Sequence, residues 1–130
     1  MISNIQSLTE NFFEIQDFDY KKDVALEIPE KEEINLSYFI EGFKDRDKEL
    51  GGTIGVIIKE KIKACDCGTI LKAEKIGTKI PQLLRMIVIA NQFSSTAREL
   101  ADNLGVVTLT HGELESIKSM YLNTKPVFDA

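Results

Sequence analysis

The pattern of apolar and polar residues is clearest in the C-terminal half of the chain. Residues 86–90 form a continuous apolar run, too short for a helix and rich in β-branched side chains, which favours a strand buried on both faces. A similar run follows at residues 106–109. The segment between them carries apolar residues at helical spacing, namely Ala97, Leu100, Ala101 and Leu104. This pattern predicts strand, helix and strand, joined as a right-handed parallel crossover.

Polar residues and a glycine mark the ends of the predicted helix. Ser94 is placed to act as its N-cap, and Thr96 with Glu99 offers a second capping box one turn later. Gly105 is placed to end the helix, because glycine readily adopts the left-handed conformation of a C-terminal cap.

The remaining chain alternates between helical and strand-like patterns. Helical spacing predicts helices at residues 3–14 and 67–76, the second capped by Asp66 and ended by Gly77, and a last short helix after Gly112. Alternating or β-branched runs predict strands at residues 18–28, 34–43 and 53–62, the last two as a hairpin. We expect residues 123–130 to be a loosely held tail.

The resulting order of elements, α-β-β-β-α-β-α-β-α, predicts an α/β fold in one domain spanning residues 1–130. We expect a three-layer sandwich around a mixed β-sheet, with an antiparallel meander followed by the parallel β-α-β crossover. The chain is 43% hydrophobic, which is enough to bury a core at this length of 130 residues.

Net charge, hydrophobicity and cysteine content limit the partners and the cellular compartment expected for the protein. The net charge of −5 disfavours a general nucleic-acid coat, although it allows a local basic face. No apolar run approaches the roughly 20 residues that span a bilayer, and the N-terminus lacks the pattern of a secretory leader. A disulfide between Cys65 and Cys67 would be strained, which favours a reducing compartment. We therefore expect a soluble, cytoplasmic protein without a membrane partner.

A resemblance to a known family rests mainly on residues 87–114. An apolar strand, Phe93-Ser94, a helix with Ala97 and Ala101, and Gly105 before an apolar strand are followed by Gly112-Glu113-Leu114. Together with the element order, this stretch resembles the Mrr-type branch of the PD-(D/E)xK nucleases. The resemblance implies a restriction-endonuclease-like fold.

In that family, an Asp on the second strand and a Glu or Gln two residues before a Lys on the third strand hold a divalent metal and the attacking water. Oxygen ligands suit Mg²⁺, which lowers the pKa of bound water and neutralises charge on the phosphate. Laid on this chain, the pattern places the lysine at Lys59, the Glu position at Ile57 and the Asp position on or near Ser37. Because an alkyl group cannot bind Mg²⁺ and a hydroxyl is a poor substitute for a carboxylate, Lys59 is interpreted as vestigial. Glu41, on the same face as Ser37, is the carboxylate that could replace the missing ligand.

Two groups of residues are candidates for nucleic-acid contact. Lysines are concentrated from the third strand to the following helix, at Lys59, Lys61, Lys63, Lys72, Lys75 and Lys79. Gln92 and Ser94 lie between a strand end and a helix start, where backbone amides favour an anion. A solvated face explains the lysines equally well, and capping explains Ser94.

A metal site of another kind is disfavoured. Cys65, Cys67 and His111 are too few and wrongly spaced for structural zinc. His111 could act as a general base, but a histidine in a surface turn is the better interpretation.

Three functional hypotheses follow from these residues. The favoured one is a catalytically inactive nuclease-fold module that binds nucleic acid or serves as an accessory protein, without a cofactor. The second is an active endonuclease that uses Mg²⁺ through a relocated carboxylate such as Glu41. The third is a protein-interaction or dimerisation domain without nucleic-acid binding. The expected partners are therefore DNA or another protein, including a second copy of the chain as a homodimer.

Overall fold

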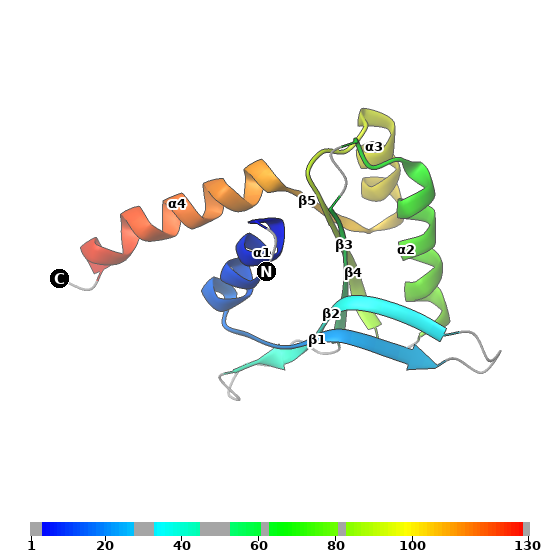
Figure 1. Ribbon diagram of the computed structural model, residues 1–130, viewed down its shortest axis with the longest axis horizontal. Helices are drawn as coiled ribbons and strands as arrows, with labels where there is room; N and C mark the ends of the chain where they lie inside the picture. Colours follow the sequence, from blue (N-terminus) through cyan, green and yellow to red (C-terminus); the bar gives the residue numbers. More distant parts are fainter. Residues whose placement is uncertain (1–3, 28–32, 45–52, 61–62, 81–82, 129–130) are drawn as a thin grey trace.

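A computed structural model describes residues 4–27, 33–44, 53–60, 63–80 and 83–128 of the chain (Figure 1). Within these ranges, four helices and five strands follow one another as α1 (Asn4–Gln16), β1 (Phe18–Glu27), β2 (Glu33–Phe43), β3 (Thr53–Lys59), α2 (Cys67–Lys79), β4 (Leu83–Ala90), α3 (Ser95–Leu104), β5 (Val107–Thr110) and α4 (His111–Phe128). The predicted order of elements is confirmed. Among the described residues, no helix has the length and apolar character needed to cross a membrane.

The strands form one mixed sheet in the order β1-β2-β3-β4-β5. β1 pairs with β2 and β2 with β3 in antiparallel fashion, whereas β3 with β4 and β4 with β5 are parallel. The predicted mixed α/β sheet is therefore confirmed. The parallel ladder of β3 and β4 ends where Lys59 faces Ala90, which fixes the point at which the chain leaves the sheet.

Helices cover both faces of the sheet, and a hydrophobic core lies on each side. In Figure 1, α1 and α4 lie on one side and α2 and α3 on the other. The first core packs α1 and Leu114 of α4 against residues such as Tyr38 and Ile89. The second packs α2 and α3 against residues such as Leu36 and Val88. Val88 and Ile89 are each 0% exposed, so β4 is buried on both faces as predicted.

The helix caps follow the sequence signals. Ser94 Oγ accepts a hydrogen bond of 3.1 Å from the Ala97 amide, and Gly105 ends α3 with a φ of 75°. Asp66 Oδ1 accepts a hydrogen bond of 3.1 Å from the Gly68 amide at the start of α2. These caps confirm both ends predicted for α3 and the start predicted for α2.

Four predicted boundaries were wrong. The third strand ends at Lys59, where its partner β4 ends at the paired Ala90, and the predicted end at residue 62 lies outside the described residues. α2 continues past Gly77, whose missing side chain brings the helix close to β4: an added Cβ would lie 3.3 Å from Met86 Cγ. β4 begins at Leu83, which pairs with β3. α4 extends through the backbone of residue 128, so the expected loose tail is helical there.

The apolar stripe of α3 is narrower than its spacing predicts. Ala97 and Ala101 are fully buried, whereas Leu104 is 38% exposed. Leu104 lies in the last turn before Gly105, where the chain turns back toward β5, and the helix there no longer packs fully on the sheet.

The Gly112-Glu113-Leu114 stretch forms a capping box at the start of α4. Thr110 Oγ1 accepts a hydrogen bond of 3.1 Å from the Glu113 amide, and Glu113 Oε1 accepts one of 3.0 Å from the Thr110 amide. The same oxygen accepts a hydrogen bond of 2.7 Å from Arg98 on α3. Leu114 is 1% exposed. The stretch that carried the family resemblance therefore connects α3, β5 and α4 structurally.

Candidate functional site

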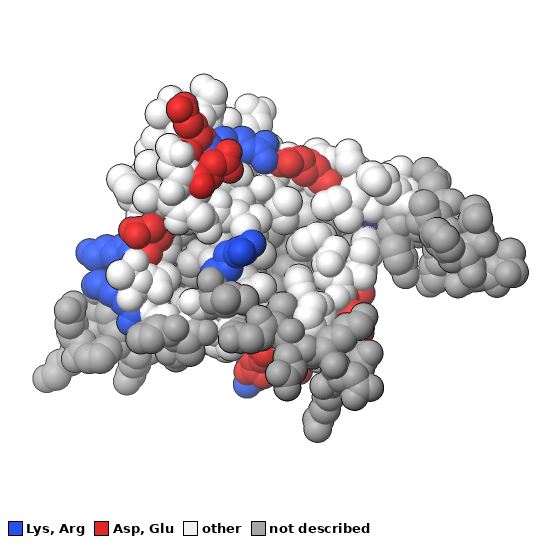
Figure 2. All heavy atoms as spheres, turned by 180° about the vertical axis from the view of Figure 1, so that it is seen from behind, with Lys and Arg blue, Asp and Glu red and all other residues white. Residues whose placement is uncertain are grey.

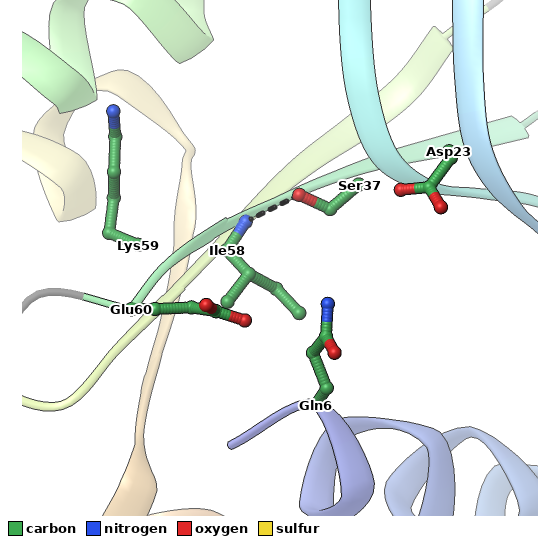
Figure 3. Close-up of a pocket in the computed structure, with 6 residues that line it drawn as sticks. All are labelled: Gln6, Asp23, Ser37, Ile58, Lys59 and Glu60. Atoms are coloured by element: carbon green, nitrogen blue, oxygen red, sulfur yellow. Dashed lines mark hydrogen bonds between the residues drawn. The ribbon is translucent and has the colours of Figure 1, made fainter. Parts of the chain in front are cut away.

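A pocket of about 560 Å³ opens between α1 and the sheet, on the side away from α2. It is lined by Gln6 of α1, Asp23 of β1, Ser37 of β2, Ile58 and Lys59 of β3, and Glu60 just after β3 (Figure 3). The pocket thus brings together residues from the first helix and the first three strands. It lies where the family pattern places its catalytic residues, at Ser37 and the end of β3.

The pocket exists because β1 and β2 change faces at Asp23 and Ser37. Tyr20 belongs to the core beside α1, whereas Leu26, an even number of residues later, packs against the core beside α2. Asp23 adopts a φ of 52°, a left-handed conformation that aspartate tolerates better than most residues. The left-handed conformation of Asp23 interrupts the regular alternation of side chains along β1. Apolar side chains before Asp23 therefore pack in the core beside α1, and those after it pack in the core beside α2.

Ser37 has a structural partner at this crossing point. Its Oγ accepts a hydrogen bond of 3.0 Å from the Ile58 amide, beyond the last paired residues of β2 and β3, Tyr38 and Val56. The hydroxyl therefore satisfies a strand amide that the ladder leaves without a carbonyl partner. The position expected for a metal-binding aspartate carries a hydroxyl that joins the two strands.

Lys59 and Glu60 diverge at the end of β3. Figure 3 shows the Glu60 carboxylate turned toward Ile58 and Gln6, while the Lys59 side chain extends to the opposite side of the strand. Asp23 also turns toward the space around Ile58. A nuclease lysine must converge with the metal-binding carboxylates to orient the attacking water. Here the lysine and the carboxylates of the pocket point apart.

The other residues of the family pattern are also placed. Ile57 packs against the core beside α2 and offers no ligand atom. Glu41 pairs with Lys21 at 2.9 Å, and its neighbour Ile40 pairs with Ile54 at the start of β3. Because strands rise about 3.3 Å per residue, Glu41 lies roughly 13 Å along β2 from Ser37 and away from the end of β3. The structure does not bring Glu41 and Lys59 together.

Sequence reasoning did not single out Asp23 or Gln6. An acidic residue inside an otherwise alternating strand was the only signal for Asp23, and it does not by itself distinguish a bulge from a solvated face. Gln6 lies on the α1 face of the pocket only because α1 packs against the sheet. Both assignments depend on tertiary structure.

The residues of the pocket do not fit a magnesium centre well. Asp23 and Glu60 are two carboxylates, and Gln6 offers an amide oxygen. Among the described residues, no three His, Cys, Asp or Glu side chains gather as they would around a metal ion. Lys59, which would complete the family's arrangement, points elsewhere.

A charged and aromatic cluster lies next to the pocket on α1. The Tyr38 hydroxyl, on a residue that is 0% exposed, donates a hydrogen bond of 2.7 Å to Glu10 Oε2. Lys22 Nζ lies 3.3 Å from the same oxygen. The hydrogen bond from Tyr38, followed by the contact with Lys22, outweighs burial and holds the pKa of Glu10 below its ordinary value. Burial and the neighbouring carboxylate raise the pKa of Tyr38, so the phenol stays protonated.

The predicted nucleic-acid residues fall into two groups. Lys63 and Lys72 are exposed near and on α2, and Lys61 lies outside the described residues. Lys59 and Lys63 line a second pocket of about 210 Å³ with Ala64, Cys65, Asp66 and Thr69. The Ser94 hydroxyl accepts the Ala97 amide as the cap of α3. The Gln92 carbonyl accepts a hydrogen bond of 2.8 Å from the Cys65 amide. The Gln92 side chain remains exposed.

Cys65, Cys67 and His111 do not form a common site. Both cysteines are free, and Cys65 is buried at the start of α2. His111 begins α4, where its Nε2 lies 2.7 Å from Asn4 Nδ2 and its Nδ1 lies 3.4 Å from Glu115 Oε1. The histidine therefore joins α1 to α4 and is not an isolated turn residue.

The sheet and the helices form a mixed α/β fold. No protein-family model matches the chain, and a search of curated proteins likewise finds no match. Solved structures do resemble it. A protein of unknown function, AF1548, is 13% identical with a TM-score of 0.70, over 89% of this chain and 66% of that one.

Two further neighbours agree on the fold. Protein VC1899 from Vibrio cholerae is 15% identical with a TM-score of 0.60, over 89% of this chain and 30% of its own length. A repair endonuclease from Pyrococcus abyssi is 13% identical with a TM-score of 0.52, over 85% of this chain and 48% of its own length. The likeness supports a restriction-endonuclease-like fold, and the chain spans at most about two thirds of any of these proteins. The narrower Mrr-type assignment stays a prediction.

Proposed function

We propose that this chain is a nuclease-fold module that binds nucleic acid without hydrolysing it. In this proposal it has the three-layer arrangement and the right-handed crossover of the restriction-endonuclease-like fold. The observation that carries the proposal is the divergence of Lys59 from Asp23 and Glu60 (Figure 3). Metal-dependent hydrolysis needs a lysine and carboxylates around one phosphate, and this chain separates them across a strand.

Two further features support the loss of hydrolysis. Ser37 stands where the family pattern has an aspartate, and its hydroxyl already serves the Ile58 amide. Glu41, the carboxylate that could have replaced the missing ligand, pairs with Lys21 toward the other end of β3. Neither residue supplies a carboxylate to the pocket.

A nicking assay tests the absence of hydrolysis. Supercoiled plasmid is incubated with the wild-type chain in Mg²⁺ and, separately, in Mn²⁺. We expect no nicking above that of a buffer control. The proposal is contradicted if the wild type nicks the plasmid in a metal-dependent manner and the double variant Asp23→Asn/Glu60→Gln does not. Glu41→Gln serves as the matched control, because it neutralises a carboxylate outside the pocket.

A binding assay tests the other half of the proposal. Fluorescence anisotropy with a labelled DNA duplex is expected to give binding that weakens steeply as salt rises, since phosphate contacts release counterions. An RNA duplex of the same sequence shows which sugar is preferred. If neither duplex binds even at low salt, the module is a protein-interaction or dimerisation domain and the proposal fails.

A further inference from the structure

The lysines of this chain are used differently on the two sides of the molecule. On the side of α1, β1 and β2, three lysines each pair with a glutamate: Lys21 with Glu41 at 2.9 Å, Lys22 with Glu10 at 3.3 Å, and Lys44 with Glu14 at 2.6 Å. Their positive charge is already balanced within the protein. This side therefore offers little net charge to a polyanion.

The α2 side has lysines without such partners. Within the described ranges, no ion pair joins Lys59, Lys63, Lys72 or Lys75 to a carboxylate. Lys63, Lys72 and Lys75 are exposed. Lys72 and Lys75 are three residues apart, so their side chains are neighbours on the helix surface, and like charges at such spacing cost a few tenths of a kcal/mol. No ion pair within the described residues offsets this repulsion between Lys72 and Lys75.

Basic side chains of α2 lie along one line of the helix. Lys72 and Lys75 fall on one stripe of α2, because three residues complete slightly less than one helical turn. On the face shown in Figure 2, turned by 180° from Figure 1, basic side chains gather at the α2 edge on the left. In that view one acidic side chain lies beside this basic group, and others lie over the α3 end.

A small pocket adjoins the start of this stripe. Lys59 and Lys63 line it together with Thr69, whose hydroxyl can donate to an anion. Asp66 also lines it, but one of its oxygens already accepts the Gly68 amide as a helix cap. At about 210 Å³ the pocket is smaller than a typical small-molecule site and has room for a phosphate group.

We propose that the phosphate backbone of a nucleic-acid duplex lies along α2, with one phosphate in the pocket between Lys59 and Lys63. This inference rests on the proposed function and assigns its binding surface. Lys59 extends to this side of β3 and away from Asp23 and Glu60. Lys59 also lines the first pocket, so the bound phosphate lies next to that pocket, on the side of β3 away from Asp23 and Glu60. Recognition through phosphates carries no sequence preference of its own.

The experiment compares two double neutralisations that remove the same charge. Lys72→Gln/Lys75→Gln acts on the α2 stripe, and Lys21→Gln/Lys44→Gln acts on lysines that already pair with glutamates. Each removes two positive charges from a chain of net charge −5. Duplex binding is followed by anisotropy over a range of salt concentrations, with circular dichroism to check that each variant is folded. Lys59→Gln/Lys63→Gln tests the pocket in the same way.

The α2 variant is expected to flatten the slope of log K against log salt by about two, because each phosphate contact contributes about 0.9. At about 0.1 M salt this corresponds to a roughly 30- to 100-fold weaker affinity. The pocket variant is expected to weaken binding by a similar factor, and the Lys21/Lys44 variant by less than about threefold.

The outcomes separate the two proposals. If the wild type binds and both the α2 and the Lys21/Lys44 variants weaken it equally, the surface is wrong while nucleic-acid binding stands. If the wild type does not bind either duplex, the proposed function fails together with this inference. If poly-L-glutamate displaces the duplex at equal charge concentration, by binding the same lysines, the surface serves an acidic protein, which also contradicts the inference.

Discussion

Glu113 is the residue whose removal tests the packing of the C-terminal half most sharply. One of its oxygens accepts hydrogen bonds from the Thr110 amide at 3.0 Å and from Arg98 at 2.7 Å. Truncation to alanine removes half of a capping box, which costs about 1 kcal/mol. It also removes an ion pair in which Arg98 and Glu113 are 39% and 42% exposed, which contributes about 0.2–1 kcal/mol. Glu113→Ala is therefore expected to destabilise the protein by about 1–2 kcal/mol.

Two other substitutions separate the cap from the charge. Glu113→Gln keeps an oxygen that can accept the Thr110 amide and loses only the ion pair, so we expect a loss of about 0.5 kcal/mol. Thr110→Ala removes the acceptor of the Glu113 amide and should cost about 1 kcal/mol. Glu115→Ala is the matched control on the same helix. Its carboxylate is 56% exposed and, among the described side chains, pairs with His111 at 3.4 Å, so its loss should stay under about 0.5 kcal/mol.

Urea unfolding followed by far-ultraviolet circular dichroism measures these differences as shifts of the midpoint at constant slope. In thermal unfolding, each kcal/mol corresponds to about 3–5 °C for a domain of this size. If Glu113→Ala and Glu115→Ala are equally stable, the capping box does not hold α4 in place. Equal losses for Glu113→Gln and Glu113→Ala would instead assign the whole effect to charge.

Three other substitutions or conditions have defined outcomes. Tyr38→Phe removes a buried hydroxyl from Glu10 and should cost about 1–2 kcal/mol by urea unfolding, whereas a loss near zero would mean that water replaces it. Gly105→Ala should cost about 1 kcal/mol from backbone strain alone, since its φ is 75° and nothing lies within 4 Å of an added Cβ; an unchanged midpoint would contradict that conformation. Acid should destabilise the protein: the pKa values of Glu10 and Glu113 are lowered in the folded state, so their stabilisation is complete above the unfolded pKa of about 4.3 and is lost as pH falls through the folded values. A stability that stays flat from pH 6 to pH 3 would rule out this contribution.

The pKa of Glu113 shows how opposing effects are balanced in this cap. Burial alone would raise it, but hydrogen bonds from the Thr110 backbone, from Arg98 and from the Thr110 side chain together hold it below its ordinary value. In Glu113→Gln, the part of the acid sensitivity that comes from this residue should disappear. The difference between the pH profiles of the two proteins isolates it.

Much of the fold could be predicted because its signals are local. Ser94 and Gly105 mark the ends of α3 by the hydrogen-bonding and backbone preferences of serine and glycine, and both marks hold in the structure. The apolar run of β4 also predicted its burial between two cores, since only a central parallel strand buries both faces. Gly77 was misleading because a glycine that ends a helix and a glycine that allows close packing look alike in sequence.

The candidate site depended on features that a single sequence does not contain. Neighbouring side chains of an extended chain point to opposite faces, and Figure 3 shows Lys59 and Glu60 on opposite sides at the end of β3. Which face carries the pocket depends on the change of faces at Asp23 and Ser37, which involves two strands and a left-handed residue. The pairing of lysines with glutamates likewise joins residues far apart in sequence, such as Lys44 and Glu14. Sequence reasoning therefore found the lysines without distinguishing balanced from unbalanced ones.

A nuclear magnetic resonance titration tests most directly where nucleic acid meets this fold. Amide signals of the isotope-labelled protein are followed as a DNA duplex is added in the presence of Mg²⁺. The account predicts shifts concentrated on α2 and around Lys59, Lys63 and Thr69, with the signals of Gln6, Asp23 and Ser37 unchanged. Shifts concentrated on Gln6, Asp23 and Ser37, with α2 unaffected, would contradict it.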